Sequence, residues 1–280
     1  MRLMSFETGG RASWGVVEGE GVRDIGAAAG DRWPTLRAAL DAGALAEAVA
    51  VDAPVLALAD VTFLPVIPQP ERIFCVGINY ASHIAETGRE TPTHPMIFVR
   101  WPSSQVGHGQ PMVCPKDSHK FDFEGELAVI IGTGGRRIPA DKALEHVAGY
   151  SCYNDGSIRD FQRHTFQFTP GKNFPDTGGF GPWMVTGDEI PDPSALTLET
   201  RLNGEVMQAA PISDLVFDVP ALVAYLSLWT PLSPGDVIIT GTTGGVGAFR
   251  EPPVWMKDGD TVEVEISGIG TLKNPVVAEA

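Results

Sequence analysis

The chain has 280 residues, of which 43% are hydrophobic and 20% are charged. It is long enough to bury one large core or two smaller ones, and its composition excludes a disordered segment and a disulfide-stapled miniprotein. The formal net charge of −15 repels phosphate backbones and anionic membrane surfaces, so we expect neither a nucleic acid nor a membrane as a partner. An anionic substrate would have to be attracted by a local cluster of positive charge or by a bound divalent cation.

The first 70 residues predict a small unit without chemical motifs. Residues 1–24 alternate short apolar runs with glycines, which indicates antiparallel hairpins. The segment from Trp33 to about Ala50 predicts a helix that begins near a proline. A proline cluster at 65–70 is typical of a linker, so we expect a small N-terminal α/β domain over 1–70 and a second domain over 71–280.

The rest of the chain is rich in strands. Several of its strand segments are continuous apolar runs, typical of strands covered on both faces. The segments are 73–76, 96–99, 127–131, 237–240 and 261–266. Asn203-Gly204 predicts a two-residue hairpin turn, and helices are expected at 79–86, 157–166 and 219–229. The pattern predicts an α+β fold with a mixed sheet that wraps into a roll or barrel.

Three carboxylates form a candidate metal site. Glu124 and Glu126 stand two residues apart on a strand and therefore project to the same side. Asp155 lies in the turn before a predicted helix, for which Ser157 would be the N-cap. An oxygen-only set of this kind suits Mg²⁺ or Mn²⁺ better than zinc. A solvated strand face is the alternative for the glutamate pair alone.

Arg159 and Gln162 are candidate substrate-binding residues. They stand at positions i and i+3 of the predicted helix, so a guanidinium and an amide share one face and could together hold a carboxylate. The alternative is a surface arginine that pairs with Asp160 or Glu126.

His83 and Glu86 form a candidate catalytic pair at positions i and i+3 of the first predicted helix. A carboxylate beside an imidazole raises its basicity and fixes its tautomer, as a base that activates water requires. A surface pair is the alternative. Lys172 lies in a loop rich in glycine and proline, which can bring a cation close to a ligand. The Gly241–Gly247 segment lacks the Gly-Lys-Ser/Thr ending of a phosphate loop, so we expect no nucleotide site.

The cysteines indicate a reducing compartment. Cys75, Cys114 and Cys152 are odd in number and lack metal-binding spacing, so we expect reduced core residues. The N-terminal residues do not form an apolar signal segment. Together these features predict a cytoplasmic protein.

Taken together, these segments resemble the fumarylacetoacetate hydrolase family over roughly residues 70–276. The resemblance depends on five motifs in the family's order: Gly77–Tyr80 with His83 and Glu86, Glu124–Leu127, Asn154 and Asp155 with Ser157, Arg159, Asp160 and Gln162, then Lys172, and Gly241–Gly247. It implies a mixed β-roll catalytic domain, usually in a homodimer. It also implies Mg²⁺ or Mn²⁺ on Glu124, Glu126 and Asp155, and a His–Glu pair on a lid over about residues 79–95.

The resemblance implies an enzyme that acts on a 2-oxo acid. The family contains C–C bond hydrolases of 2,4-dioxo acids, decarboxylases of the oxaloacetate type and isomerases of hydroxymuconate-like dioates. We expect hydrolysis of an acylpyruvate or fumarylacetoacetate-like acid, with decarboxylation or isomerisation as the alternative. His83, Glu86 and Lys172 would be catalytic, and Arg159, Gln162 and Thr242 would bind substrate. A ligand sensor without turnover is a further alternative, which the loss of a metal carboxylate or of the histidine would favour, and neither is lost.

Three positions depart from the family pattern. Thr243 stands where members usually have proline, Gly156 where many have a β-branched residue, and His108 lies in a turn where histidine is unexpected. None is a predicted metal ligand, so these departures concern the identity of the substrate.

Overall fold

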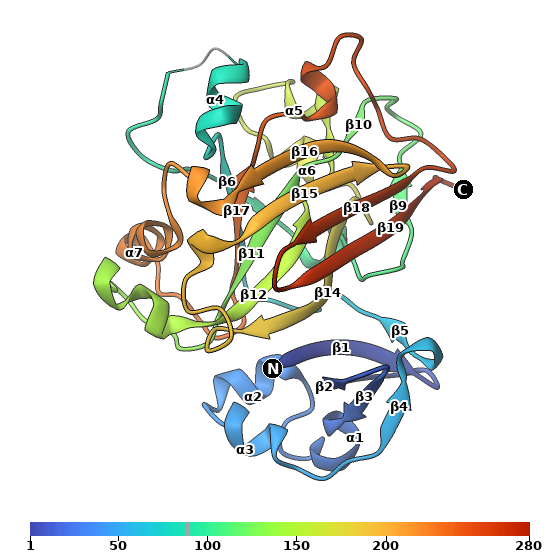
Figure 1. Ribbon diagram of the computed structural model, residues 1–280, viewed down its shortest axis with the longest axis vertical. Helices are drawn as coiled ribbons and strands as arrows, with labels where there is room; N and C mark the ends of the chain where they lie inside the picture. Colours follow the sequence, from blue (N-terminus) through green and yellow to red (C-terminus); the bar gives the residue numbers. More distant parts are fainter. Residues whose placement is uncertain (88–89) are drawn as a thin grey trace.

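The computed structural model describes residues 1–87 and 90–280 and confirms the α+β class with mixed sheets (Figure 1). The strands are β1 (Arg2–Thr8), β2 (Arg11–Glu18), β3 (Gly21–Asp24), β4 (Val55–Ala57), β5 (Thr62–Phe63), β6 (Ile73–Gly77), β7 (Met96–Arg100), β8 (Gln105–Val106), β9 (Met112–Cys114), β10 (Phe121–Asp122), β11 (Gly125–Ile131), β12 (Val147–Asn154), β13 (Ser157–Ile158), β14 (Gly178–Thr186), β15 (Thr197–Leu202), β16 (Glu205–Pro211), β17 (Val237–Thr242), β18 (Thr261–Ile266) and β19 (Gly270–Ala278).

Helices are short and few by comparison. The α-helices are α1 (Ile25–Ala29), α2 (Leu36–Asp41), α3 (Leu45–Val49), α4 (Ala81–Thr87), α5 (Arg159–Gln162), α6 (Thr169–Lys172) and α7 (Val219–Trp229). The 3-10 helices are η1 (Leu58–Asp60), η2 (Pro102–Ser104), η3 (Ala140–His146), η4 (Pro193–Ala195), η5 (Ile212–Asp214) and η6 (Gly247–Phe249). Within the described residues, no helix has the length and apolar character needed to cross a bilayer.

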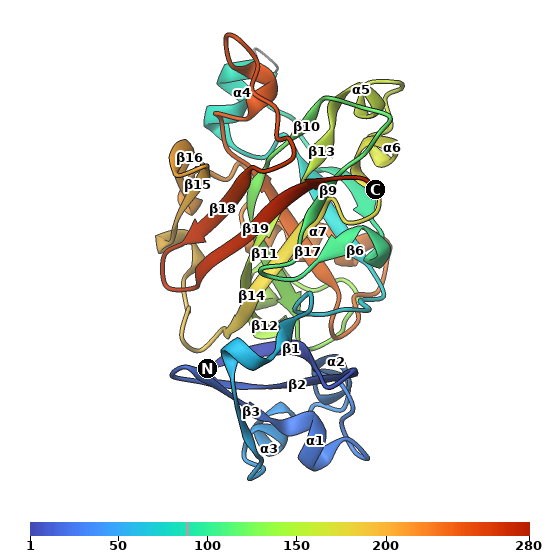
Figure 2. The same ribbon diagram turned by 90° about the vertical axis from the view of Figure 1, so that its right-hand side faces the viewer.

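Two sheets carry the architecture. The larger has the order β4-β3-β2-β1-β14-β12-β11-β17-β6-β7, with β5 on β1 and β8 on β14, and the smaller has the order β16-β15-β18-β19-β9. A short ladder of β10 and β13 lies beside them. Figures 1 and 2 show the smaller sheet against one face of the larger one, and side chains from both sheets and from α7 share one buried core.

Strand β11 lies at the centre and is covered on both faces, as its apolar run predicts. Leu127 and Val129 point into the core shared with the smaller sheet, whereas Ala128 and Ile130 pack into a second core with Trp14 of the N-terminal region. All the residues of β11 are buried. The packing on both faces therefore fixes the start of the strand, where Glu124 and Glu126 lie.

The N-terminal region contains the predicted hairpins, but not the single helix expected from Trp33 to Ala50. Two short helices, α2 and α3, replace it, because Gly43 adopts a φ of 61° that ends the helical path. Strand β1 pairs antiparallel with β14, so the large sheet runs on into this region. The division near residue 70 stays a prediction.

Local sequence signals predict the hairpin correctly but not the helix expected over 157–166. Asn203 and Gly204 both have positive φ, 53° and 83°, as a type I′ turn requires. The helix expected over 157–166 is confined to α5, and the predicted cap, Ser157, instead belongs to β13, where its hydroxyl donates to the Asp155 carbonyl. Lys172 lies at the end of α6 and not in an open loop.

Gly125 allows the two sheets to approach where β11 begins. A Cβ at this position would overlap with Thr200 Oγ1 of β15 and approach Val264 Cγ1 to 3.3 Å. We therefore expect Gly125→Ala to lower the free energy of unfolding by about 1–3 kcal/mol, as overpacking of a core does. Denaturant unfolding at a fixed protein concentration measures this change.

The matched control is the double variant Gly125→Ala with Thr200→Ala, which removes the hydroxyl that the new methyl group would meet. We expect a positive coupling between the two substitutions, with the double variant more stable than Gly125→Ala alone. Equal stability of Gly125→Ala and the wild type would contradict this account of the sheet contact.

Candidate active site

A cavity of about 80 Å³ lies where α4, α5, α6 and the ends of β11 and β17 meet. Most of the sequence-predicted site residues line it: His83, Glu124, Glu126, Arg159, Gln162, Lys172 and Thr242. Asp155 and Glu86 lie directly behind this lining, bonded to Lys172 and to His83. The structure thus brings together segments that are far apart in the sequence.

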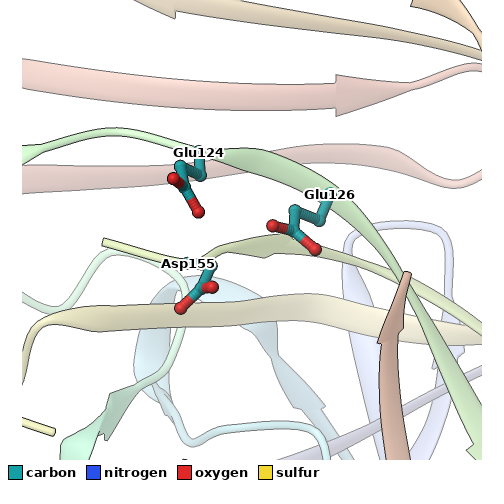
Figure 3. Close-up of side chains that lie close together, drawn as sticks. All are labelled: Glu124, Glu126 and Asp155. Atoms are coloured by element: carbon teal, nitrogen blue, oxygen red, sulfur yellow. The ribbon is translucent and has the colours of Figure 1, made fainter. Parts of the chain in front are cut away.

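The three predicted metal carboxylates converge because of strand register. Strands β11 and β12 pair antiparallel with Gly125 opposite Asn154, so Glu124 and Glu126 on one strand meet Asp155 at the end of the other. Figure 3 shows the three side chains close together, and one ligand atom from each lies within 4.8 Å of the others. Their exposed fractions are 6%, 2% and 0%, which excludes a solvated strand face.

The surroundings shift the pKa values of Glu124 and Glu126 in opposite directions. Burial alone would raise the pKa of Glu124, but Arg159 and Lys172 lower it to about 2. Burial, followed by the charges of Asp155 and Glu124, raises the pKa of Glu126 well above its ordinary value. Glu126 accepts a hydrogen bond of 2.5 Å from the Gly241 amide but makes no ion pair among the described residues. Its negative charge is thus the least compensated of the three.

The donor set fits a hard divalent cation. All three groups offer oxygen atoms, which is the chemistry that Mg²⁺ and Mn²⁺ prefer. Around the cavity, the described residues include four buried carboxylates (Asp122, Glu124, Glu126 and Asp155) and three buried cations (Arg100, Arg159 and Lys172). A cation on the triad would relieve the repulsion that raises the pKa of Glu126. It would also leave the cluster with a net positive charge, which favours an anionic ligand.

Lys172 bridges two members of the triad. Its Nζ lies 2.6 Å from Glu124 Oε2 and 2.7 Å from Asp155 Oδ2. Burial would lower its pKa, but Asp155 and Glu124 raise it, so the side chain remains an ammonium group. It can attract and hold an anionic oxygen, but it cannot serve as a base at neutral pH.

Arg159 is a buried residue, so the surface arginine paired with Asp160 or Glu126 is wrong. Its Nε donates to Asp122 at 2.8 Å, and its Nη1 lies 2.6 Å from Glu124 Oε1 and donates to Gln162 at 2.9 Å. Strand pairing decided this outcome, because β10, which carries Asp122, pairs with β13, and β13 leads directly into α5. Its Nη2 is buried without a hydrogen-bond partner in the described part of the chain, and this free donor suits an incoming carboxylate.

The His83–Glu86 pair forms as the spacing predicts. His83 Nδ1 lies 3.1 Å from Glu86 Oε2, and Glu86 Oε1 accepts from the Gly245 amide at 3.0 Å. The imidazole is 8% exposed, and its ring packs edge-on against Phe249 at 5.8 Å, which does not fit a surface pair. Because a carboxylate only accepts, Nδ1 carries the proton and Nε2 is left as the basic nitrogen.

The loop after β17 joins the site to α4. Thr242 Oγ1 donates to the Gly125 carbonyl and accepts from Gln208, so the protein itself already uses this hydroxyl. Thr243 Oγ1 lies 3.0 Å from Ser82 Oγ, in the first turn of α4, and a proline at position 243 would lack this contact. Of the lid expected over residues 79–95, positions 88 and 89 lie outside the described residues.

The other two departures from the family pattern are structural. A Cβ at Gly156 would overlap with the Thr177 carbonyl, so this chain requires glycine there. His108 packs its ring against Phe63 at 5.0 Å and accepts from the Lys273 amide. Neither residue lines the cavity.

Sequence reasoning missed several residues that build the site. Arg100 donates to Asp155 at 2.6 Å, and Asp122 accepts from Arg159 and from the amides of Gly247 and Ala248. Arg100 follows an apolar run directly and Asp122 belongs to the same segment as the glutamates, so both positions offered a signal. Gln208, which joins Gly125 to Thr242, lies within a hairpin strand and offered none.

Comparisons with known proteins identify the family of this chain. The family model described as "Fumarylacetoacetate (FAA) hydrolase C-terminal" matches residues 72–277. Human oxaloacetate tautomerase FAHD2A, mitochondrial, is 43% identical over 232 residues, which cover 82% of this chain and 74% of that protein. The expectation of a cytoplasmic protein is contradicted by this relative, whose name places it in mitochondria. Free cysteines exclude only an oxidising compartment and do not distinguish among reducing ones.

Two solved structures resemble the whole chain. Fumarylacetoacetate hydrolase from Exiguobacterium antarcticum superposes with a TM-score of 0.87 at 38% identity, with 100% of each chain covered. Maleylpyruvate hydrolase from Sphingobium sp. SYK-6, solved with manganese(II) and pyruvate, gives a TM-score of 0.81 at 30% identity, again over 100% of each chain. On the family match, the relative and these structures together, this chain belongs to the fumarylacetoacetate hydrolase family.

Proposed function

We propose that this enzyme is a divalent-metal-dependent tautomerase of an oxaloacetate-like 2-oxo dicarboxylic acid. In this reaction a proton leaves C3, a proton is gained on the C2 oxygen, and no other atom enters or leaves. The observation that carries the proposal is the buried triad of Glu124, Glu126 and Asp155 at the floor of a cavity lined by His83 and Arg159, in a chain 43% identical to a protein named oxaloacetate tautomerase.

The comparisons support this alternative better than the C–C bond hydrolysis that the sequence favoured. Tautomerisation and hydrolysis require the same holding groups and one base, and they differ in whether an attacking water is needed. Hydrolysis is the second candidate, because a structure with a TM-score of 0.81 is named maleylpyruvate hydrolase. Decarboxylation of the same acid is related chemistry, since it also places negative charge on the C2 oxygen.

In this proposal Glu124, Glu126 and Asp155 hold Mg²⁺ or Mn²⁺. The bound cation would act as a Lewis acid that makes negative charge on the keto oxygen less costly. The three side chains are already close together and buried, so little reorganisation would be required to hold it.

His83 is the proposed base, and Glu86 its positioning residue. Because Nδ1 bonds to Glu86, Nε2 is free to remove the C3 proton, and the resulting imidazolium can deliver a proton to the C2 oxygen; the reverse transfers convert the enol to the ketone. Glu86 is itself held by the Gly245 amide, so the orientation of the imidazole depends on the docking of α4 against the loop after β17.

Arg159, Gln162 and Lys172 are the proposed substrate-holding groups. The free Nη2 of Arg159 suits the carboxylate at the 2-oxo end, and the Lys172 ammonium adds positive charge beside it. Thr242 contributes mainly by fixing Gly125 and Gln208, since its hydroxyl is already bonded. The homodimer and the division near residue 70 also remain proposals.

The first test is the reaction of the wild-type enzyme. We expect Mn²⁺-loaded protein to accelerate loss of the enol absorbance of oxaloacetate in proportion to enzyme concentration, with no change in the mass of the acid. In parallel, acylpyruvates in ¹⁸O-labelled water should release no labelled acid. Labelled acid without any effect on the oxaloacetate enol would make the enzyme a hydrolase and overturn the proposal.

A second prediction concerns the base. His83→Gln should lower kcat for tautomerisation by about 10²–10⁴-fold, which is the usual contribution of a positioned acid or base. Stopped-flow absorbance measures the rate, and titration calorimetry should show that Mn²⁺ affinity is unchanged. His146→Gln is the matched control, because this ring contacts the Thr133 carbonyl and does not line the cavity. Activity retained by His83→Gln would exclude histidine as the base.

A third prediction concerns the metal. Glu126→Gln should weaken Mn²⁺ binding by at least about 100-fold, because even supporting residues around a metal contribute 10–100-fold. Glu126 is the suitable position, since substitution of Glu124 would also remove one carboxylate partner each from the buried Arg159 and Lys172. Titration calorimetry measures the affinity, with the exposed Glu205→Gln as control.

The same titrations predict a dependence on pH. Because the pKa of Glu126 is raised, metal-free protein retains a proton there to a higher pH than an ordinary glutamate does, and below that pKa a cation must displace the proton. Mn²⁺ affinity of the wild type should therefore rise with pH until Glu126 is ionised, with release of a proton to the buffer. Unchanged Mn²⁺ affinity in Glu126→Gln would show that the ligand assignment is wrong.

A further inference from the structure

Arg163 stands at the C-terminal end of α5, on the rim of the cavity. Its backbone amide donates to the Asp160 carbonyl, and its exposed side chain contributes to the lining. The guanidinium makes no ion pair and no hydrogen bond with the described residues. Its recorded contact is with the ring of Phe249, whose centroid lies 5.9 Å from Cζ.

The other cations of the site are engaged with carboxylates. Arg159 pairs with Asp122 and Glu124, and Lys172 pairs with Glu124 and Asp155. Among the described residues that line the cavity, Arg163 is thus the permanent cation whose charge no protein carboxylate balances. In a chain of net charge −15, such a residue creates a local positive potential at the entrance.

Phe249 connects this cation to the proposed base. The Arg163 guanidinium lies over one part of the ring, and the His83 imidazole packs edge-on against it at 5.8 Å. Cation–π contact with an exposed ring stabilises a guanidinium modestly but leaves its donors free. Arg163 therefore has a defined position and unused hydrogen-bonding capacity on the rim of the cavity, separated from the proposed base by the ring of Phe249.

Arg159 and Arg163 lie at the inner and outer ends of the cavity. They stand four residues apart, one helical turn, so both can face the same space, and the cavity lining includes both. Arg159 is 5% exposed at the inner end, where its free Nη2 suits the 2-oxo acid, whereas Arg163 lies at the outer end. An acid that reaches from one to the other would present a carboxylate at each end.

We propose that Arg163 recognises the second carboxylate of the substrate and so makes the enzyme selective for dianionic 2-oxo acids over monoanionic ones. The inference rests on the proposed tautomerase function and adds a specificity-determining residue to it. Its chemistry is a charge-assisted hydrogen bond between a guanidinium and a carboxylate, which a neutral ester cannot replace.

The test compares oxaloacetate with its 4-methyl ester, which keeps the reacting atoms and lacks the second charge. We expect Arg163→Gln to lower kcat/KM for oxaloacetate about tenfold, the lower end for a hydrogen bond to a charged group, because the rim is partly solvated. For the ester, kcat/KM should change by less than about threefold. Arg163→Lys should recover part of the loss. The Arg2→Gln variant is the matched control, since it removes an arginine over the ring of Trp183, outside the cavity.

The outcomes separate this inference from the function on which it rests. Equal losses on the two substrates, or no loss on either, would overturn the role of Arg163 while leaving the tautomerase activity established. Failure of the wild type to act on either compound would reject the proposed function itself. Loss of selectivity in Arg2→Gln as well would assign the effect to general electrostatics and overturn the specific contact.

Discussion

Repulsion among three buried carboxylates is the constraint on which the rest of the site depends. The register of β11 and β12 places Glu124, Glu126 and Asp155 together in a core where water cannot screen them. Lys172 and the arginines around it pair with two of the three, whereas the hydrogen bond that Glu126 accepts among the described residues comes from a backbone amide. Buried ion pairs of this kind add little net stability, but removal of one partner is strongly destabilising. A bound cation would relieve this repulsion, so the three carboxylates suit a metal site better than a purely structural role.

Much of the framework could be predicted because its causes are local. The apolar run 127–131 requires a strand covered on both faces, and Asn203-Gly204 requires a type I′ turn. The spacing of His83 and Glu86 on α4 was equally informative. Ser157 was wrongly predicted as a helix cap because it pairs with β10 in a short ladder, and no residue near it in the sequence indicates this pairing.

Partners across the cavity could not be predicted. The spacing placed Arg159 beside Gln162, which it contacts, but did not identify Asp122 and Glu124 as its carboxylate partners. Burial could not be predicted either, since the lysine expected in a loop rich in glycine and proline is an enclosed ammonium group at the end of α6. The choice among activities was out of reach for a related reason. Residues that hold a 2-oxo acid serve hydrolysis, decarboxylation and tautomerisation alike, so the motifs identify the family more sharply than the reaction.

The contact between Ser82 and Thr243 has a consequence for how relatives could diverge. It joins α4 to the loop after β17 through two neutral hydroxyls, so salt does not screen it. Two neighbouring contacts of α4 carry charge: Glu86 accepts from the Gly245 amide of the loop, and Asp214 accepts from the Ser82 hydroxyl. A single replacement at position 243 would loosen the helix without altering any group that holds substrate. Evolution could therefore adjust at one site how firmly α4 is held against the loop after β17, independently of the groups that line the cavity.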